Sequence, residues 1–139
     1  MSNHAWTSTS DRIEKPWGHE IAWCALPQIH GKILHINEGM RTSFKYNKIK
    51  DEVLFVLDGE LHVTYGDENC KFDSVDSPIK NKKLLPGDVL YIQSGSPYRL
   101  HAVKECQIVE IGNRKTGQVI RVQDDHDRET RMENWAKDL

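Results

Sequence analysis

The sequence predicts an all-β domain, in which many short strands close into a sandwich or barrel that a short C-terminal helix follows. Apolar residues alternate with period two in short runs that are rich in β-branched and aromatic side chains. Turn-forming residues bound these runs, and no helical pattern separates them. A chain of 139 residues is long enough for one such domain with a substantial core.

The expected elements follow one another along the chain, and the clearest strands are 52–57, 61–65, 89–92 and 107–111. The polar stretch 67–83, with lysines near its end, is interpreted as a long hairpin connection. Helical spacing appears only over 128–137. We therefore divide the chain into three parts, which are a flexible N-terminal arm (1–12), a barrel (13–128) and a helical tail (129–139).

The composition of the chain argues against several classes of binding partner and of structural site. The net charge is -2 and 29% of residues are charged, so neither nucleic acid nor a membrane is an expected partner. No apolar run approaches the roughly 18 residues of a membrane span, and residues 1–11 have no signal-peptide core. Three unevenly spaced cysteines without a CxxC argue against disulfides or a structural zinc site. We expect a cytoplasmic protein.

Turn glycines at fixed spacing match two motifs, G-x5-H-x-H-x4-E-x6-G and G-x5-P-x-G-x2-H. The positions of the first are filled by Gly39, Lys45, Asn47, Glu52 and Gly59, and those of the second by Gly87, Gln93, Gly95 and Tyr98. These are the cupin motifs, and the chain resembles the cupins. The resemblance implies a double-stranded β-helix, also called a jelly-roll barrel, whose tight connections use glycines at positive φ.

Within the cupins, the chain looks most similar to the type II mannose-6-phosphate isomerase domain, which often forms the C-terminal part of mannose-1-phosphate guanylyltransferases. The matching segments, in order, are 15–18, 32–39, 97–100 and 119–128. Together they span roughly residues 13 to 128. This resemblance implies a small polar or phosphorylated, carbohydrate-like ligand in a barrel pocket.

The metal-binding positions of the cupin motifs are mostly replaced. Cupin sites use imidazole and carboxylate ligands, whereas this sequence has Lys45, Asn47 and Tyr98 at three of the four positions. Only Glu52 remains. A protonated lysine repels a cation, and amide and phenol groups are poor ligands for a divalent transition metal. We therefore expect a degenerate metal site and no cofactor, so a divalent metal would need ligands outside the motifs.

Three of these residues are candidates for catalysis. If the alignment holds, Lys45 and Glu52 both face the barrel interior, where they form either a structural ion pair or part of a reactive cluster with Tyr98. Aldose–ketose isomerisation needs a base and an electrophile that stabilises the enediolate. Glu52 would be the base and Lys45 the electrophile. The sequence leaves both interpretations open.

Three further residues are candidates for ligand binding. Arg99 follows the second motif directly, and its guanidinium could hold a phosphate at two points, although a surface arginine fits the pattern equally well. Asn47 replaces a motif ligand, and Trp17 is either packing or a platform for a sugar ring. The histidines, of which His35, His62 and His101 lie on expected strands, are interpreted as packed or exposed side chains.

Three functions remain open at this stage. In the first, the chain binds its ligand without a metal, and the sequence leaves turnover open. In the second, it is a sugar-phosphate isomerase that either uses a metal or relies on Glu52 and Lys45. In the third, it is a non-catalytic structural or regulatory barrel. Sheets of this size have outer faces and edges that need covering, so we also expect a homodimer.

Overall fold

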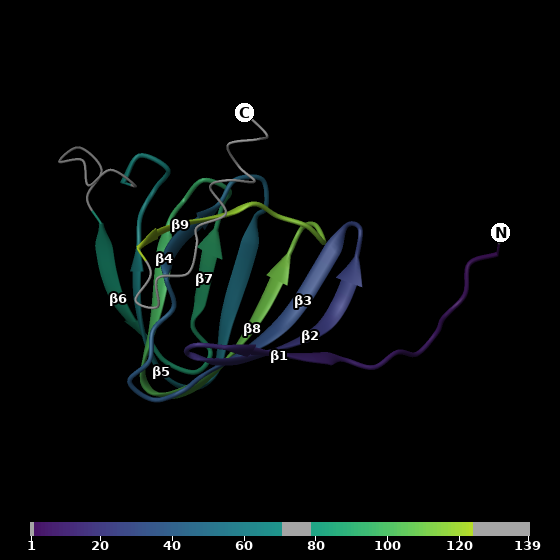
Figure 1. Ribbon diagram of the computed structural model, residues 1–139, viewed down its shortest axis with the longest axis horizontal. Coiled ribbons are helices and arrows are strands. Elements are labelled where there is room, and N and C mark those ends of the chain that lie inside the picture. The colour runs from purple at the N-terminus through teal and green to yellow at the C-terminus, as the bar shows by residue number, and fades with distance from the viewer. Residues whose placement is uncertain (1, 71–78, 124–139) are drawn as a thin grey trace.

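The computed structural model describes residues 2–70 and 79–123, and this part of the chain is all β (Figure 1). Its strands are β1 (Asp11–Lys15), β2 (Gly18–Leu26), β3 (Ile29–Ile36), β4 (Phe44–Asn47), β5 (Glu52–Tyr65), β6 (Lys80–Leu84), β7 (Val89–Ile92), β8 (Tyr98–Gly112) and β9 (Val119–Gln123). No helix of the described residues is long and apolar enough to cross a membrane. The helix that the sequence predicts over 129–139 lies outside the described residues.

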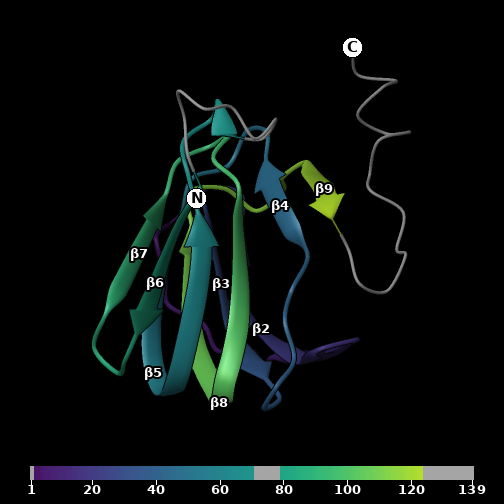
Figure 2. The same ribbon diagram turned by 90° about the vertical axis from the view of Figure 1, so that its left-hand side faces the viewer.

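Two long strands, β5 and β8, hold the barrel together. They pair antiparallel along almost their whole length, and register shifts around Asp58 and Glu60 bend them. One half of this ladder carries β7 on the β5 side and β3, β2 and β1 on the β8 side, all antiparallel. The other half carries β6 beside β5, and β4 and β9 beside β8. The sheet therefore curls into two layers around one interior (Figure 2).

The glycines of the expected turns have the predicted backbone. Gly39, Gly59, Gly87 and Gly95 all have positive φ, between 81° and 96°. The requirement for glycine is strictest at Gly59, in the bend of β5, where an added Cβ would lie 2.2 Å from the carbonyl oxygen of Glu105. A side chain there would meet both a strained backbone and a neighbouring strand.

The hydrophobic core fills one end of the space between the layers. Ile36, Leu61, Val63, Leu100 and Ile108 are completely buried, and they come from both halves of the β5–β8 ladder and from β3. The polar side chains of the interior gather away from this core, around the first residue of β5. The core thus provides a rigid base, and the rest of the interior is left for a polar site.

Candidate functional site

A small polar pocket of about 140 Å³ lies inside the barrel, between β3, β4, β8 and β9. Eight of its lining residues are ionisable as bases or carboxylic acids, and they are Lys15, Lys32, Lys45, Lys50, Arg121, Glu20, Glu52 and Glu110. We call it the inner pocket. Five basic groups therefore face three acidic ones, which gives the inner pocket a net positive charge when all are ionised.

The sequence-predicted residues gather here with one exception. Lys45, Asn47, Glu52, Tyr98 and Trp17 line the inner pocket. Arg99 is not among its lining residues; the side chain is buried, and its Nε donates a hydrogen bond of 2.9 Å to the carbonyl oxygen of Thr42. The structure therefore brings the three catalytic candidates together and places Arg99 on the other face of β8.

The centre of the inner pocket is a pair of carboxyl groups from neighbouring strands. Glu52 begins β5, Glu110 lies near the end of β8, and a hydrogen bond links their side chains. Burial, the charge of Glu110 and this hydrogen bond raise the pKa of Glu52 to about 8. Glu52 therefore keeps a proton at neutral pH and donates it to Glu110.

Glu110 takes the opposite state. Burial alone would raise its pKa, but the hydrogen bond from His30 and the charge of Lys32 outweigh burial and hold the pKa at about 2. The Nε2 atom of His30 lies 2.7 Å from Glu110 Oε2, and Lys50 Nζ lies 2.8 Å from His30 Nδ1. His30 Nδ1 also lies 3.2 Å from the carbonyl oxygen of Arg114. Since an ionised carboxylate only accepts hydrogen bonds, Nε2 donates to Glu110. A chain of hydrogen bonds thus runs from Lys50 to Glu52.

Lys45 and Tyr98 face each other across the β4–β8 pairing. Lys45 Nζ lies 4.9 Å from the centre of the Tyr98 ring, in cation–π contact. Burial lowers the pKa of Lys45 to about 8, although Glu110 and Glu52 act in the opposite direction. The Glu52 carboxyl lies 3.9 Å from Nε2 of His30. Lys45 is therefore a buried cation held by an aromatic ring and by more distant carboxylates.

Asn47 has a structural task as well as a place in the lining. Its Oδ1 atom accepts hydrogen bonds from the backbone N–H groups of Ile49, Lys50 and Gln118, at 3.2, 3.0 and 3.3 Å. These contacts shape the connection from β4 to β5 and tie it to the segment before β9. Trp17 is also largely structural, since it is buried in the core cluster that borders the inner pocket.

Ser43, which the sequence analysis did not identify as a site residue, forms part of the wall of the inner pocket. Its side chain is buried, with 1% of its surface exposed, and it lines the inner pocket. Within the described part of the chain, its Oγ has no hydrogen-bond partner. A buried hydroxyl without a partner is costly, so this atom is a ready contact for a polar ligand group.

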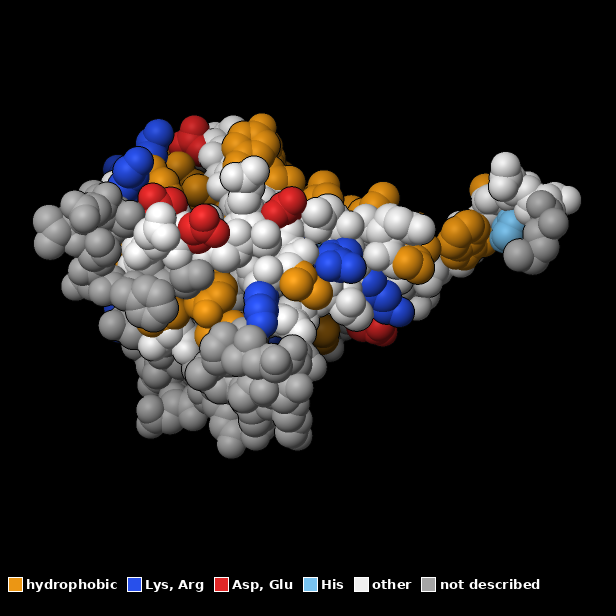
Figure 3. Space-filling model, turned by 90° about the horizontal axis from the view of Figure 1, so that it is seen from above, with side chains coloured by type: hydrophobic (Ala, Val, Ile, Leu, Met, Phe, Trp, Pro, Cys, Tyr) orange, Lys and Arg blue, Asp and Glu red, His pale blue; other side chains and the backbone are white. Residues whose placement is uncertain are grey.

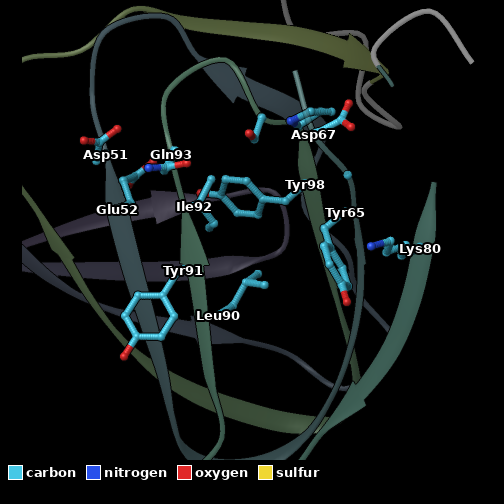
Figure 4. Close-up of a pocket in the computed structure, with 13 residues that line it drawn as sticks. Asp51, Glu52, Tyr65, Asp67, Lys80, Leu90, Tyr91, Ile92, Gln93 and Tyr98 are labelled. Carbon is cyan, nitrogen blue, oxygen red and sulfur yellow. The ribbon is translucent and has the colours of Figure 1, made fainter. Parts of the chain in front are cut away.

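A second, larger cavity of about 630 Å³ adjoins the inner pocket and shares Glu52 and Tyr98 with it. In Figure 4, Tyr98 projects from β8 toward Glu52 and Ile92. Because Tyr98 and Glu52 line both spaces, they lie at the boundary between them. A hydrogen bond links the Tyr98 hydroxyl to Glu52, and burial raises the pKa of Tyr98 well above 10. We call this space the outer cavity; aromatic and polar residues line it, among them Tyr65, Tyr91, Asp67, Lys80 and Gln93.

Glu52 and Glu110, which line the inner pocket, and the adjacent His30 form a group of side chains that could surround one metal ion. Donor atoms of His30, Glu52 and Glu110 lie within 4.8 Å of one another. The surroundings do not suit a divalent cation, because Lys50 contacts the same histidine and Lys45 approaches the same carboxylates. Glu52 also holds a proton that a metal would have to displace. This donor set fits a proton-sharing network better than a metal centre.

The histidine and the second carboxylate of this network were not identified from the sequence. The structure has His30 in β3, buried, with its ring against the carboxylate of Glu110. Glu110 could have been predicted to point inward, because it lies two residues after the buried Ile108 on the same strand, β8. Nothing in the sequence alone places His30 beside it, because their strands are paired across 80 residues of chain.

Comparison with known proteins supports the fold. No family model matches the sequence, and no curated protein sequence matches it. Solved structures do match: a mutant of Bacillus subtilis oxalate decarboxylase OxdC has a TM-score of 0.68 at 12% identity, over 86% of this chain and 34% of that one. KdgF from Halomonas sp. has a TM-score of 0.62 at 13% identity, over 76% and 89%.

This chain has the cupin fold. The capsular polysaccharide assembling protein CapF from Staphylococcus aureus is a further neighbour, with a TM-score of 0.63 at 11% identity over 78% of this chain. The match covers 31% of CapF, so this cupin spans about a third of the length of that protein. At such identities the likeness concerns the barrel and does not extend to a substrate.

Proposed function

We propose that this cupin binds a small phosphorylated, carbohydrate-like ligand in the barrel interior, without a metal ion. The observation that carries the proposal is the excess of basic groups in the inner pocket, beside a buried Ser43 hydroxyl that lacks a partner in the described residues. Because Glu52 retains its proton, only two of the three acidic groups carry negative charge. The pocket then has an excess of three positive charges, which favours an anionic group.

The two spaces match two parts of such a ligand. The inner pocket, at about 140 Å³, is smaller than the roughly 300–1,000 Å³ of typical small-molecule sites. It has room for a phosphate but little for a complete sugar. The outer cavity, at about 630 Å³, has tyrosines and hydrogen-bonding side chains that suit a polar ring. The resemblance to mannose-6-phosphate isomerase domains, and the fold shared with a capsular polysaccharide assembling protein, favour a sugar for this part.

The test is thermal unfolding with mannose 6-phosphate, mannose and inorganic phosphate, each at the same ionic strength. Mannose 6-phosphate should raise Tm, inorganic phosphate should raise it less, and mannose should have no effect. At a concentration 100 times Kd, the stabilisation would be about 2.7 kcal/mol. The Lys45→Met variant should lose the response to both phosphates, whereas Lys83→Met, on the outer side of β6, should keep it. Equal responses of the two variants would contradict binding in the inner pocket.

Isomerase activity is a second candidate, favoured by the hydrogen bond between Tyr98 and Glu52 and by the position of Lys45. With a pKa of about 8, a fraction of Glu52 has released its proton to solvent near neutral pH, and this carboxylate can take the C2 proton of a bound substrate as a general base. Lys45 would stabilise the developing enediolate. NMR in D2O tests this, because isomerisation exchanges the proton at C2 of mannose 6-phosphate for deuterium. Exchange that Glu52→Gln abolishes would favour the enzyme, and binding without exchange would favour a carrier or sensor.

A non-catalytic barrel is the third candidate. It would follow if neither sugar phosphates nor inorganic phosphate changed Tm and no exchange occurred. The inner network would then be a structural feature that holds the two layers together.

A further inference from the structure

The outer face of one layer of the barrel carries an apolar area over five of its six strands, and the sixth, β1, places Arg12 beside Ile21 at one edge. An antiparallel sheet that covers a core with one face usually presents polar side chains on the other. Here the cross-strand neighbours form two rows across the layer. One row runs over β2, β3, β8, β5 and β7 and consists of Ile21, Ile33, Val109, Phe55 and Val89. The other runs over β3, β8, β5 and β7 and consists of Gly31, Ile111, Val53 and Tyr91, and the ring of Trp23, from the bulge in β2, lies over Gly31. We call these residues the outer apolar face.

Several of these side chains are strongly exposed. Tyr91 is 80% exposed and Trp23 46%, and Phe55, Val89 and Ile111 are each about 40% exposed. Trp23 packs flat against the sheet, since an added Cβ on Gly31 would lie 2.4 Å from its ring. In Figure 3 hydrophobic side chains line the upper rim of the molecule, where this layer lies. Contiguous exposed apolar areas of this kind are often interaction surfaces.

The extent of the face indicates how much a partner would bury. Five strands spaced about 4.8 Å apart give a width of roughly 20 Å, and two rows add a height of about 14 Å. The face therefore offers on the order of 300 Å², whereas a stable interface buries roughly 600–1,000 Å² on each partner. A dimer that used this face would need a second contact region of similar size.

The N-terminal arm is a suitable second region. Residues 2–10 run away from the barrel at the end of β1, and every one of them is exposed (Figures 1 and 3). Trp6 is 65% exposed, and its ring contact is with His4 of the same arm. At about 3.3 Å per residue, nine extended residues reach roughly 30 Å, which exceeds the width of the outer apolar face.

We propose that two copies of this chain pair through their outer apolar faces and exchange their N-terminal arms. The rows contain no charged residue, so the face can pack against its own copy about a two-fold axis, as two sheets of a sandwich do. Each copy supplies both an arm and a face, and together they reach the area that a stable dimer requires. Trp6 is the anchor of the arm, because a large aromatic ring contributes most to an interface when it is fully buried.

The proposed dimer would also cover part of the opening of the outer cavity. Tyr91 belongs to the outer apolar face and lines the outer cavity. A second copy on this face therefore covers one rim of the outer cavity and helps to enclose a bound ligand. This consequence rests on the proposed function, whereas the dimer itself does not.

Sedimentation velocity of the full chain over about 1–100 µM tests the proposal. The expected mass is twice the 16.1 kDa of the chain. Phe55→Glu and Val89→Lys, at two half-exposed positions of the row that starts at Ile21, should each give a folded monomer. Trp6→Ala should raise the dimer Kd at least about tenfold. Val103→Glu is the matched control, since Val103 is 46% exposed but lies in the bend of β8 outside both rows, and it should leave the dimer intact.

Circular dichroism and Tm establish that each variant is folded. A monomeric wild-type chain at the highest concentration would overturn the proposal. So would dimers that persist in both row variants, or a Trp6→Ala variant with unchanged Kd. Binding of mannose 6-phosphate by a folded monomeric variant would separate the two proposals, because it would preserve the ligand site while the dimer is lost.

Discussion

Replacing Glu52 by glutamine should make the protein more stable than the wild type at neutral and alkaline pH. The wild-type carboxyl is buried next to Glu110, and its pKa is raised from 4.5 to about 8, first by burial and then by that neighbouring charge. Glutamine has nearly the same shape and can still donate a hydrogen bond to Glu110, but it never ionises. The variant therefore keeps the network and removes a proton that the folded state must retain.

The sign and size follow from linkage between protonation and folding. Below pH 4.5 the folded and unfolded chains both hold the proton, so the carboxyl carries no pH-dependent penalty. Between pH 4.5 and about 8, the unfolded chain releases the proton and the folded chain does not, so stability falls as pH rises. At about 1.36 kcal/mol per pH unit, the loss reaches roughly 3–5 kcal/mol and is constant above pH 8.

The assay is urea unfolding of the wild type and Glu52→Gln at intervals from about pH 5 to pH 9, at one fixed protein concentration. The difference in unfolding free energy should grow in favour of glutamine up to about pH 8 and then level off. Glu38→Gln, an exposed carboxylate in the turn after β3, is the control and should give a flat difference. A flat difference for Glu52→Gln would refute the assignment of the proton to Glu52.

Three other predictions follow from the same geometry. Asn47→Ala should lower the unfolding free energy by about 2–3 kcal/mol in urea titrations, because three backbone N–H groups lose their acceptor. Gly59→Ala should cost more than about 2 kcal/mol, whereas Gly87→Ala, with positive φ but open space, should cost about 1 kcal/mol; equal losses would contradict the contact with Glu105. Elemental analysis of untagged protein should find zinc, iron, manganese, nickel and cobalt far below one ion per chain, and a stoichiometric ion would mean that His30, Glu52 and Glu110 bind it.

The sequence identified the fold because its strongest local signals are turns. The four motif glycines adopt the positive φ that their spacing predicts, and alternation located β5, β7 and the second half of β8. The prediction of a hairpin connection over 67–83 was wrong at its end, because residues 80–84 form strand β6, which pairs with β5. This strand was missed because it is polar, with lysines at 80, 82 and 83. Charged side chains are common on the exposed edge strand of a sheet.

The candidate site was harder to predict for a related reason. In β3 both faces carry apolar side chains, so alternation does not tell which set of side chains points inward. The inward set of β3 includes His30 and Lys32, and the outward set includes Ile33 of the outer apolar face. Whether a polar residue in such a strand points into the barrel or out of it becomes clear only when the neighbouring strands are known. The outer apolar face that favours a dimer thus also concealed the inner network.

The three replaced motif positions form a consistent set once each is given its own task. A metal ion concentrates two positive charges at one point, whereas here the positive charge is spread over Lys45, Lys50 and the other basic groups of the inner pocket. Asn47 shapes the adjoining loop, and Tyr98 lies at the boundary between the two spaces of the interior. Since burial holds the pKa of Lys45 at about 8, this cation loses its charge just above physiological pH. An anionic ligand held this way should therefore bind more weakly above pH 8 and at high ionic strength, whereas an ion-coordinated ligand would be much less sensitive to salt.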